Sequence, residues 1–189
     1  MPAGISNRAR GFLARLTAPY RSASAAKRRR TLAGIALSAV AIGAMAVWIG
    51  QTYRIGWDRQ VNRCLGYRFY LVDLKSRPSE IGDIAVFRAA SSNPVFDEGE
   101  IVAKRLKAKA GDIVEINSRL EILINGEVVA KGLPYLKAAS DGTVARYIGK
   151  RRLKDGEYWV LGDSPSSYDS RYWGALRENQ IIGKGHALF

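Results

Sequence analysis

Residues 120–130 read LEILINGEVVA, and this stretch decides the fold class of the chain. Apolar, largely β-branched runs lie on both sides of Asn125-Gly126. An Asn-Gly pair between two such runs is a strong signal for a two-residue β-hairpin, because both residues tolerate the left-handed backbone of a type I′ turn. We therefore expect antiparallel strands at 120–124 and 127–130.

Further short strands are expected on both sides of this hairpin. Each is an apolar run next to a glycine-rich or acidic turn, at 67–74, 84–87, 101–106, 113–116, 158–161 and 181–189. Short strands at close spacing are typical of an antiparallel sheet or a barrel-like domain. We predict a mainly β fold over residues 51–189.

A different segment precedes this domain. Residues 31–50 read TLAGIALSAVAIGAMAVWIG and carry no charge. About 20 apolar residues are enough to cross a bilayer core as a helix. The basic cluster at 27–30 precedes the run directly, and basic flanks stay on the cytoplasmic side. We predict a basic cytoplasmic tail at 1–30, one transmembrane helix at 31–50, and a domain at 51–189 on the other side of the membrane.

Two other readings of the N-terminus are a cleaved signal peptide and a mitochondrial transit peptide. The uncharged run is longer than the 7–15 residues typical of a signal peptide. The Arg- and Ser-rich N-terminus resembles a transit peptide, but the uncharged run follows it directly. A retained anchor in the lipid bilayer is the favoured reading.

The charge distribution argues against a nucleic-acid partner. The chain has 189 residues and a net charge of +13. Residues 1–30 hold eight of the 30 basic residues and no acid, so residues 31–189 carry 22 basic residues against 17 acidic ones. Much of the excess therefore belongs to the tail beside the membrane span, where it is explained by membrane topology.

Cysteine and histidine each occur once, as Cys64 and His186. One histidine does not make a zinc site or a Ser-His-Asp relay, so we expect no metal or cofactor. A nucleophile in this chain would need a base other than histidine. A lone exported thiol is either buried and inert or reactive.

Residues 162–174 read GDSPSSYDSRYWG and predict a rigid polar loop, the usual place for binding and catalytic groups. This segment resembles the last signature segment of type I signal peptidases. Residues 104–112, KRLKAKAGD, and residues 81–87, IGDIAVF, resemble two other segments of that family, in the same order along the chain. The resemblance covers most of residues 62–189. It implies a peptidase of a bacterial inner membrane, with its catalytic domain in the periplasm, that cuts exported precursors beside the bilayer, after small residues such as Ala.

The resemblance also implies roles for single residues. Lys104 would be the general base, since burial in apolar surroundings disfavours the charged form of a lysine. Ser167 would hydrogen-bond the Lys104 amine, and Asp169 would pair with Arg171 or with the lysine. Arg105 and Arg171 would support the site structurally.

The nucleophile region resembles the TraF-type conjugal-transfer peptidases, which mature pilins. Their pattern runs from an Asn through Ser, Pro, Gly and Tyr to a Gly-Asp about 18 residues beyond the Ser. Here residues 62–70 read NRCLGYRFY, with Cys64 18 residues before Gly82. Cys64 stands at the Ser position, and two further positions depart from the pattern, with Gly66 for Pro and Arg68 for Gly.

Cys64 is therefore the predicted nucleophile, and its thiolate would attack a carbonyl. Asn62 is a candidate second oxyanion donor. Ser76, two residues before Pro78, is the rival nucleophile. The leading hypothesis is a pilin-processing peptidase of conjugative transfer. The alternative is a catalytically inactive relative that binds a partner of a secretion apparatus.

Overall fold

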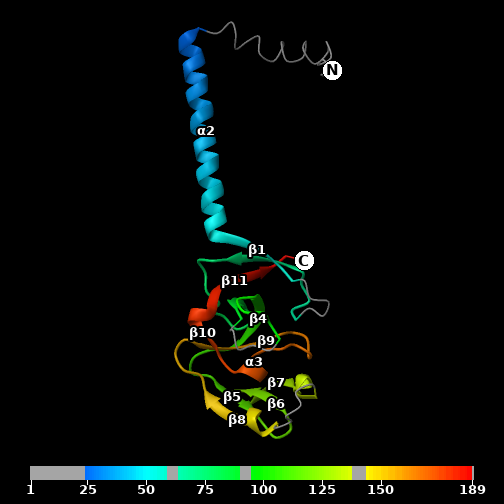
Figure 1. The fold of residues 1–189 in the computed structure, drawn as a ribbon. Coiled ribbons are helices and arrows are strands. Elements are labelled where there is room, and N and C mark those ends of the chain that lie inside the picture. Colours follow the sequence, from blue (N-terminus) through cyan, green and yellow to red (C-terminus); the bar gives the residue numbers. More distant parts are fainter. Residues whose placement is uncertain (1–23, 59–63, 90–94, 138–143, 189) are drawn as a thin grey trace, which may run out of the picture. The chain divides into compact units, whose positions relative to one another are not determined.

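The computed structural model describes residues 24–58, 64–89, 95–137 and 144–188. The chain divides into two compact units, Met1–Ile49 and Gly50–Phe189. The first unit contributes a long helix, and the second carries all of the strands (Figure 1).

Helix α2 runs from Ala25 to Thr52 and contains the uncharged segment. Its most apolar 18-residue window has a mean hydropathy of 2.2, and none of that window is buried. Twenty-eight residues at 1.5 Å each span about 42 Å, more than a bilayer core requires. The helix is long and apolar enough to cross a membrane, which suggests single-pass anchoring. It begins before the uncharged run and includes the basic cluster at 27–30.

The second unit is built on two antiparallel sheets. The seven-stranded sheet has the order β1-β2-β11-β3-β4-β9-β10, and the four-stranded sheet has the order β7-β6-β5-β8. The strands of the large sheet are β1 (Tyr53–Trp57), β2 (Phe69–Asp73), β3 (Ile84–Arg88), β4 (Ile101–Ala108), β9 (Glu157–Leu161), β10 (Leu176–Arg177) and β11 (Ile181–Ala187). Those of the small sheet are β5 (Ile113–Ile116), β6 (Glu121–Ile124), β7 (Glu127–Lys131) and β8 (Gly149–Arg152).

Short helices fill the connections. They are η1 (Pro134–Lys137), η2 (Val144–Tyr147), α3 (Ser170–Trp173) and η3 (Glu178–Gln180). The mainly β, antiparallel fold after an N-terminal apolar helix is confirmed. The hairpin forms at the Asn-Gly pair: Ile124 pairs with Glu127, and Asn125 and Gly126 have φ angles of 51° and 90°.

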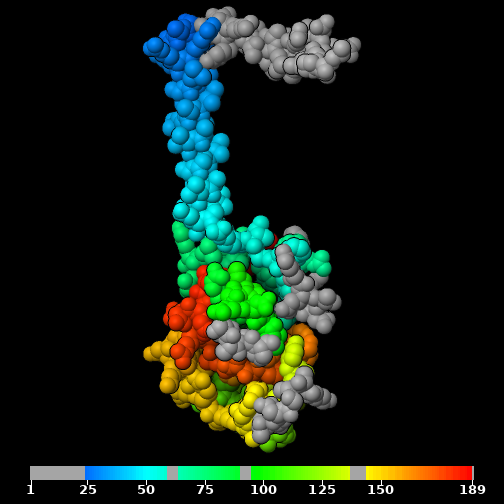
Figure 2. Space-filling view, viewed as in Figure 1, coloured from blue at the N-terminus to red at the C-terminus, as the bar shows by residue number. Residues whose placement is uncertain are grey.

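Three strands, β1, β8 and β10, were not predicted. Strand β8 has the sequence GKRR, and all four of its residues are exposed. This strand is the outer edge of the small sheet, and the golden atoms of this part of the chain lie at the surface in Figure 2. It is held by pairing with β5 and by an ion pair of 2.9 Å between Lys150 and Glu115. A strand without apolar residues has no periodic signal, so only its sheet partner reveals it.

Strand β4 positions the site through its alternation. Its even-numbered residues, Val102, Lys104, Leu106 and Ala108, are all buried, and its odd-numbered residues are more exposed. Successive side chains of a strand point to opposite faces, so a lysine two residues from a valine and a leucine is carried to the same buried face. Lys104 therefore occupies a core position by register.

Two hydrophobic clusters flank this strand. One joins Phe87, Leu106 and Leu176 of the large sheet with Phe96, which lies between β3 and β4. The other packs apolar side chains of β5 and β6 against Trp159 and Leu161 of β9. Strand β9 contributes to both clusters and ends at the polar loop that follows Leu161, so the loop starts from a firmly packed position.

A charge cluster at Glu121 gives a pH prediction. Hydrogen bonds from Asn117, Arg119 and Lys131 lower the pKa of Glu121 from 4.5 to about 2. A lowered folded pKa stabilises the protein above the unfolded pKa, and this contribution is lost as pH falls from about 4.5 toward 2. Glu121→Gln should lower the free energy of unfolding at pH 7, and the difference from the wild type should shrink toward pH 2.

Denaturant titrations at pH 7, 4 and 2.5 measure this difference. Glu127→Gln, an exposed glutamate on the next strand, is the control and should follow the wild type. A difference that stays constant from pH 7 to 2.5 would contradict the assigned charge interaction.

Candidate active site

Lys104 lies at the centre of the candidate site. Its side chain is 1% exposed, and its Nζ donates a 2.9 Å hydrogen bond to Ser167 Oγ. Phe96 lies beneath it, with 5.7 Å between Nζ and the ring centroid. Within the described residues, the Ser167 hydroxyl is the hydrogen-bond partner of this amine. A buried amine held by a single hydroxyl is in a suitable position to exchange a proton with a neighbouring group.

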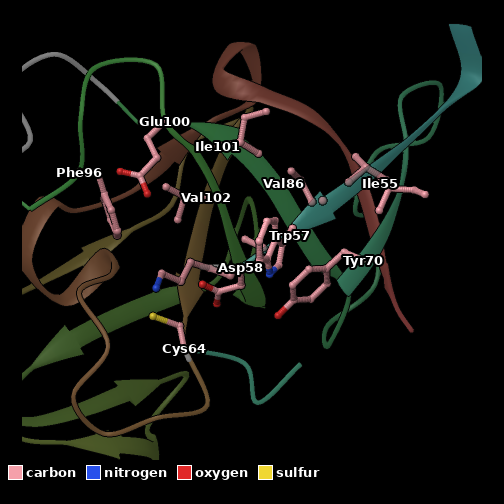
Figure 3. A pocket seen from close by; sticks show the side chains of 14 residues that line it. Ile55, Trp57, Asp58, Cys64, Tyr70, Val86, Phe96, Glu100, Ile101 and Val102 are labelled. Carbon is pink, nitrogen blue, oxygen red and sulfur yellow. The ribbon is translucent and has the colours of Figure 1, made fainter. Parts of the chain in front are cut away.

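A pocket of about 340 Å³ opens beside this amine. Lys104 and Cys64 both line it, together with residues of β1 and β4. Figure 3 shows the Cys64 sulfur and the Asp58 carboxylate in this pocket. Cys64 is half-buried. The candidate nucleophile and the candidate base therefore share one cavity of a size that accepts a peptide segment.

Cys64 is attached to the polar loop through its backbone. Its carbonyl oxygen accepts hydrogen bonds from the backbone N–H groups of Asp163, at 2.7 Å, and Ser164, at 3.1 Å. Gly162 lies directly before them, and a Cβ there would collide with the Ser167 side chain and come within 3.0 Å of the Cys64 carbonyl. The glycine permits the close approach of the two segments. The sequence pattern indicated Gly162 only as the first residue of the polar loop at 162–174.

The rest of the loop is held by a buried ion pair between Asp169 and Arg171. Arg171 Nε lies 2.8 Å from Asp169 Oδ1, and the side chains are 2% and 0% exposed. Asp169 also accepts a hydrogen bond from the Gly162 backbone N–H and caps helix α3. The sequence left two partners open for Asp169, namely Arg171 and Lys104. The structure pairs Asp169 with Arg171.

Arg171 extends this network to the backbone around Ser167. Its guanidinium donates to the carbonyl oxygens of Ser167, Pro165 and Gly132. Burial by itself lowers the pKa of Arg171, but hydrogen bonding and ion pairing with Asp169 outweigh it and raise the pKa above its usual value. Arg171 therefore stays charged and fixes the backbone that presents the Ser167 hydroxyl to Lys104.

Arg105 anchors the same loop from the other face of β4. It forms two hydrogen bonds to the Asp163 carboxylate, at 2.7 and 2.9 Å, and one to the Gly82 carbonyl oxygen at 2.9 Å. Hydrogen bonding to Arg105 holds the pKa of Asp163 below its usual range. The structure therefore shows that Asp163 is the partner of Arg105, which the sequence did not predict.

Tyr70, at the tyrosine position of the predicted nucleophile pattern, also lines the pocket. Its hydroxyl donates to the Tyr67 carbonyl oxygen at 3.1 Å. Burial, with smaller contributions from the charges of Asp58 and Cys64, raises the pKa of Tyr70 to about 12. The phenol therefore remains protonated at neutral pH and acts as a hydrogen-bond donor.

Two predicted residues do not join this cluster. Asn62 lies outside the described residues. Ser76 lies on the connection after β2, where its hydroxyl donates to Asp73 Oδ2 at 2.7 Å, and it does not line the pocket. The pocket is also lined by Phe96, Asp58 and Glu100. These residues were not predicted, because no motif marks them and the sheet brings them together from separate segments.

Comparison with known proteins decides the family. The family model described as "Signal peptidase, peptidase S26" matches residues 28–189. The chain belongs to this family. The match includes most of helix α2 and the entire β-rich unit.

Several signal peptidases are similar to this S26 chain. It is 28% identical over 133 residues to a probable signal peptidase I-2 of Synechocystis sp., covering 70% of the chain and 55% of the relative. It is 33% identical over 111 residues to signal peptidase I of Bacillus caldolyticus, covering 54% and 57%. The crystal structure of a signal peptidase I from Enterococcus faecalis is 26% identical and matches 61% of this chain and all of that one, with a TM-score of 0.37. The chain spans little more than half the length of these curated relatives.

The Asp169–Arg171 pair gives a stability prediction. Removing one partner of a buried ion pair leaves the other charge uncompensated, which costs about 3–5 kcal/mol. Arg171→Met should lower the free energy of unfolding by that amount, measured by denaturant titration. Glu115→Gln, which breaks the exposed pair with Lys150, is the matched control and should cost less than about 1 kcal/mol. Equal costs for the two variants would show that the buried pair does not hold the loop.

Proposed function

We propose that this chain is a membrane-anchored peptidase that cuts exported polypeptide precursors with Cys64 as nucleophile and Lys104 as general base. The observation that carries the proposal is the buried Lys104 amine, held 2.9 Å from Ser167 Oγ in a pocket that Cys64 also lines. The base is fixed by Ser167, and Ser167 is fixed by the Asp169–Arg171 pair. Membership of the peptidase S26 family supports the same activity.

The chemistry follows from these groups. The Lys104 amine takes the thiol proton of Cys64, and the thiolate attacks the carbonyl carbon of the scissile amide, forming a C–S bond and a tetrahedral oxyanion. When the oxyanion collapses, the C–N bond breaks and the Lys104 ammonium gives its proton to the leaving amine. The same amine then activates water, which hydrolyses the thioester and restores the thiol.

The oxyanion needs hydrogen-bond donors near the nucleophile. In our proposal the backbone N–H of Cys64 is one donor, and Asn62 is the candidate for the second. The carbonyl oxygen of Cys64 already accepts two hydrogen bonds from the loop, which fixes the peptide unit on that side of the nucleophile. A fixed backbone presents its donors without reorganisation during the reaction.

The proposed substrates are pilin-type precursors of conjugative transfer, presented at the outer face of a bacterial inner membrane. This assignment rests on the resemblance of residues 62–82 to TraF-type peptidases and on the apolar helix after a basic tail. The same acyl-enzyme serves two outcomes, since either water or the amine at the other end of the precursor can attack the thioester. Hydrolysis gives a linear product and attack by the precursor's own amine gives a cyclic one.

The test is a processing assay with the full chain in detergent micelles and a panel of purified pilin-like and signal-peptide-bearing precursors. Mass spectrometry should show cleaved products whose summed mass exceeds that of the precursor by one water, or a cyclised product without that water. Precursor that binds, as seen by co-sedimentation in liposomes, but is never cut would contradict the peptidase and favour the non-catalytic binding module.

A further inference from the structure

The Lys104 amine has two neighbours that come from different segments of the chain. Its Nζ donates a 2.9 Å hydrogen bond to Ser167 Oγ and lies 5.7 Å from the centroid of the Phe96 ring. Ser167 belongs to the polar loop after β9, and Phe96 belongs to the connection between β3 and β4. Both residues are buried, and Figure 3 shows Phe96 in the wall of the pocket. The surroundings of the amine therefore depend on contacts that hold these two segments together.

Tyr168 makes such a contact. It follows Ser167 directly in the chain, and its ring meets the Phe96 ring at a centroid distance of 5.9 Å and an interplanar angle of 66°. Tyr168 is half-buried and packs against the apolar cluster that contains Phe96. It does not line the pocket. Tyr168 is thus joined to both neighbours of the amine, to one through the chain and to the other through its ring.

Two further tyrosines fix the Tyr168 ring. Tyr172 of helix α3 stacks on it, with a centroid distance of 4.9 Å and an interplanar angle of 17°, and Tyr135 meets it edge-on at 5.5 Å and 78°. The Tyr172 hydroxyl also accepts a 3.1 Å hydrogen bond from the Tyr135 backbone N–H. Stacked and edge-to-face arrangements are the favoured geometries of aromatic pairs. The ring that contacts Phe96 is therefore held by helix α3 and by the turn η1.

We infer that Tyr168 is a positioning residue: its ring keeps Phe96 and the Ser167 hydroxyl at fixed places around the Lys104 amine. This inference rests on the proposed function, in which Lys104 is the base, and adds a residue that acts through the surroundings of that base. A displacement of about 1 Å in a catalytic arrangement can cost as much as about 10²-fold in rate. A side chain outside the pocket can therefore control the rate without touching the substrate.

Two variants of Tyr168 separate its ring from its hydroxyl. Tyr168→Leu removes the ring and keeps an apolar side chain in the cluster, so it should lower kcat for precursor cleavage about tenfold. Its KM should stay within about twofold of the wild type, because Tyr168 does not line the pocket. Tyr168→Phe keeps the ring contacts with Phe96, Tyr135 and Tyr172, so its kcat should remain within about twofold of the wild type.

Tyr158→Leu is the matched control for loss of stability. Tyr158 lies on β9 and packs against the same apolar cluster as Tyr168. Among the residues that the structure describes, its ring makes no contact with the Phe96 ring. Tyr158→Leu should therefore lower the melting temperature about as much as Tyr168→Leu does, while its kcat stays within about twofold of the wild type.

A measurement without substrate follows the Phe96 ring directly. The chain has five phenylalanines, so 4-fluorophenylalanine gives a short ¹⁹F NMR spectrum, in which Phe96→Leu identifies the signal of Phe96. In the wild type and in Tyr158→Leu, a ring held against Tyr168 or its unchanged surroundings should give a signal away from that of the free amino acid. In Tyr168→Leu the Phe96 signal should move toward the free value, because the ring averages over several positions.

The outcomes separate this inference from the proposed function. An unchanged Phe96 signal in Tyr168→Leu, a kcat that does not fall in that variant, or an equal fall of kcat in Tyr158→Leu would overturn the positioning role and leave the peptidase intact. A wild type that cuts no precursor would contradict the peptidase. If the Phe96 signal then still moved only in Tyr168→Leu, the role of Tyr168 in holding the surroundings of the Lys104 amine would be supported.

Discussion

Lys104→Met should lower kcat for precursor cleavage by about 10²–10⁴-fold, because in the proposed mechanism Lys104 is the group that takes the Cys64 proton. Methionine has nearly the same length and volume as lysine, so it fills the buried position on β4. The variant no longer has a buried amine to desolvate, but the buried Ser167 hydroxyl loses its hydrogen-bond partner, and these two effects on stability oppose each other. We therefore expect the melting temperature to change little while activity is lost.

Single-turnover kinetics and thermal unfolding of the same preparations test this combination. Lys107→Met is the matched control, since Lys107 lies on the same strand with its side chain on the other face and outside the pocket lining. Its kcat should stay within about twofold of the wild type. Full activity in Lys104→Met would rule out a lysine base, and loss of activity together with unfolding would assign Lys104 a structural role instead.

Cys64→Ala should reduce cleavage by at least about 10³-fold, because the proposed mechanism forms the acyl-enzyme on this thiol. Cys64 is the only cysteine in the chain, so a thiol-alkylating reagent should inactivate the wild type at this one position. Cys64→Ser should retain measurable but reduced activity, since a hydroxyl ionises less readily than a thiol, and it should resist the reagent.

Ser76→Ala is the control for the position of the nucleophile. Ser76 is bound to Asp73 and does not line the pocket, so its removal should leave kcat unchanged. Undiminished cleavage by Cys64→Ala would exclude the thiol as nucleophile, and loss of activity in Ser76→Ala would transfer the role to that serine. Intact-mass spectrometry of a slowly hydrolysed acyl-enzyme would show the modified residue directly.

Periodicity explains which elements the sequence predicted. The hairpin at Asn125-Gly126 and the strand at 113–116 have apolar runs and clear turns, and both form where expected. Strand β8 has neither, and β1 contains a glycine and an arginine, so both depend on their neighbours in the sheet. Local sequence predicts a strand only when the strand carries its own buried face.

The sequence by itself determined the antiparallel β class, the apolar helix and the register that buries Lys104, because these follow from alternation and composition along one segment. Tertiary structure decided the environment of the site. Asp163 contacts Cys64, and Ser167 contacts Lys104, only because β4 and β9 lie side by side in one sheet. Asp58 and Glu100 line the same pocket because the large sheet brings the end of β1 and the start of β4 together. Contacts between residues far apart in sequence depend on strand order and packing, which no single segment specifies.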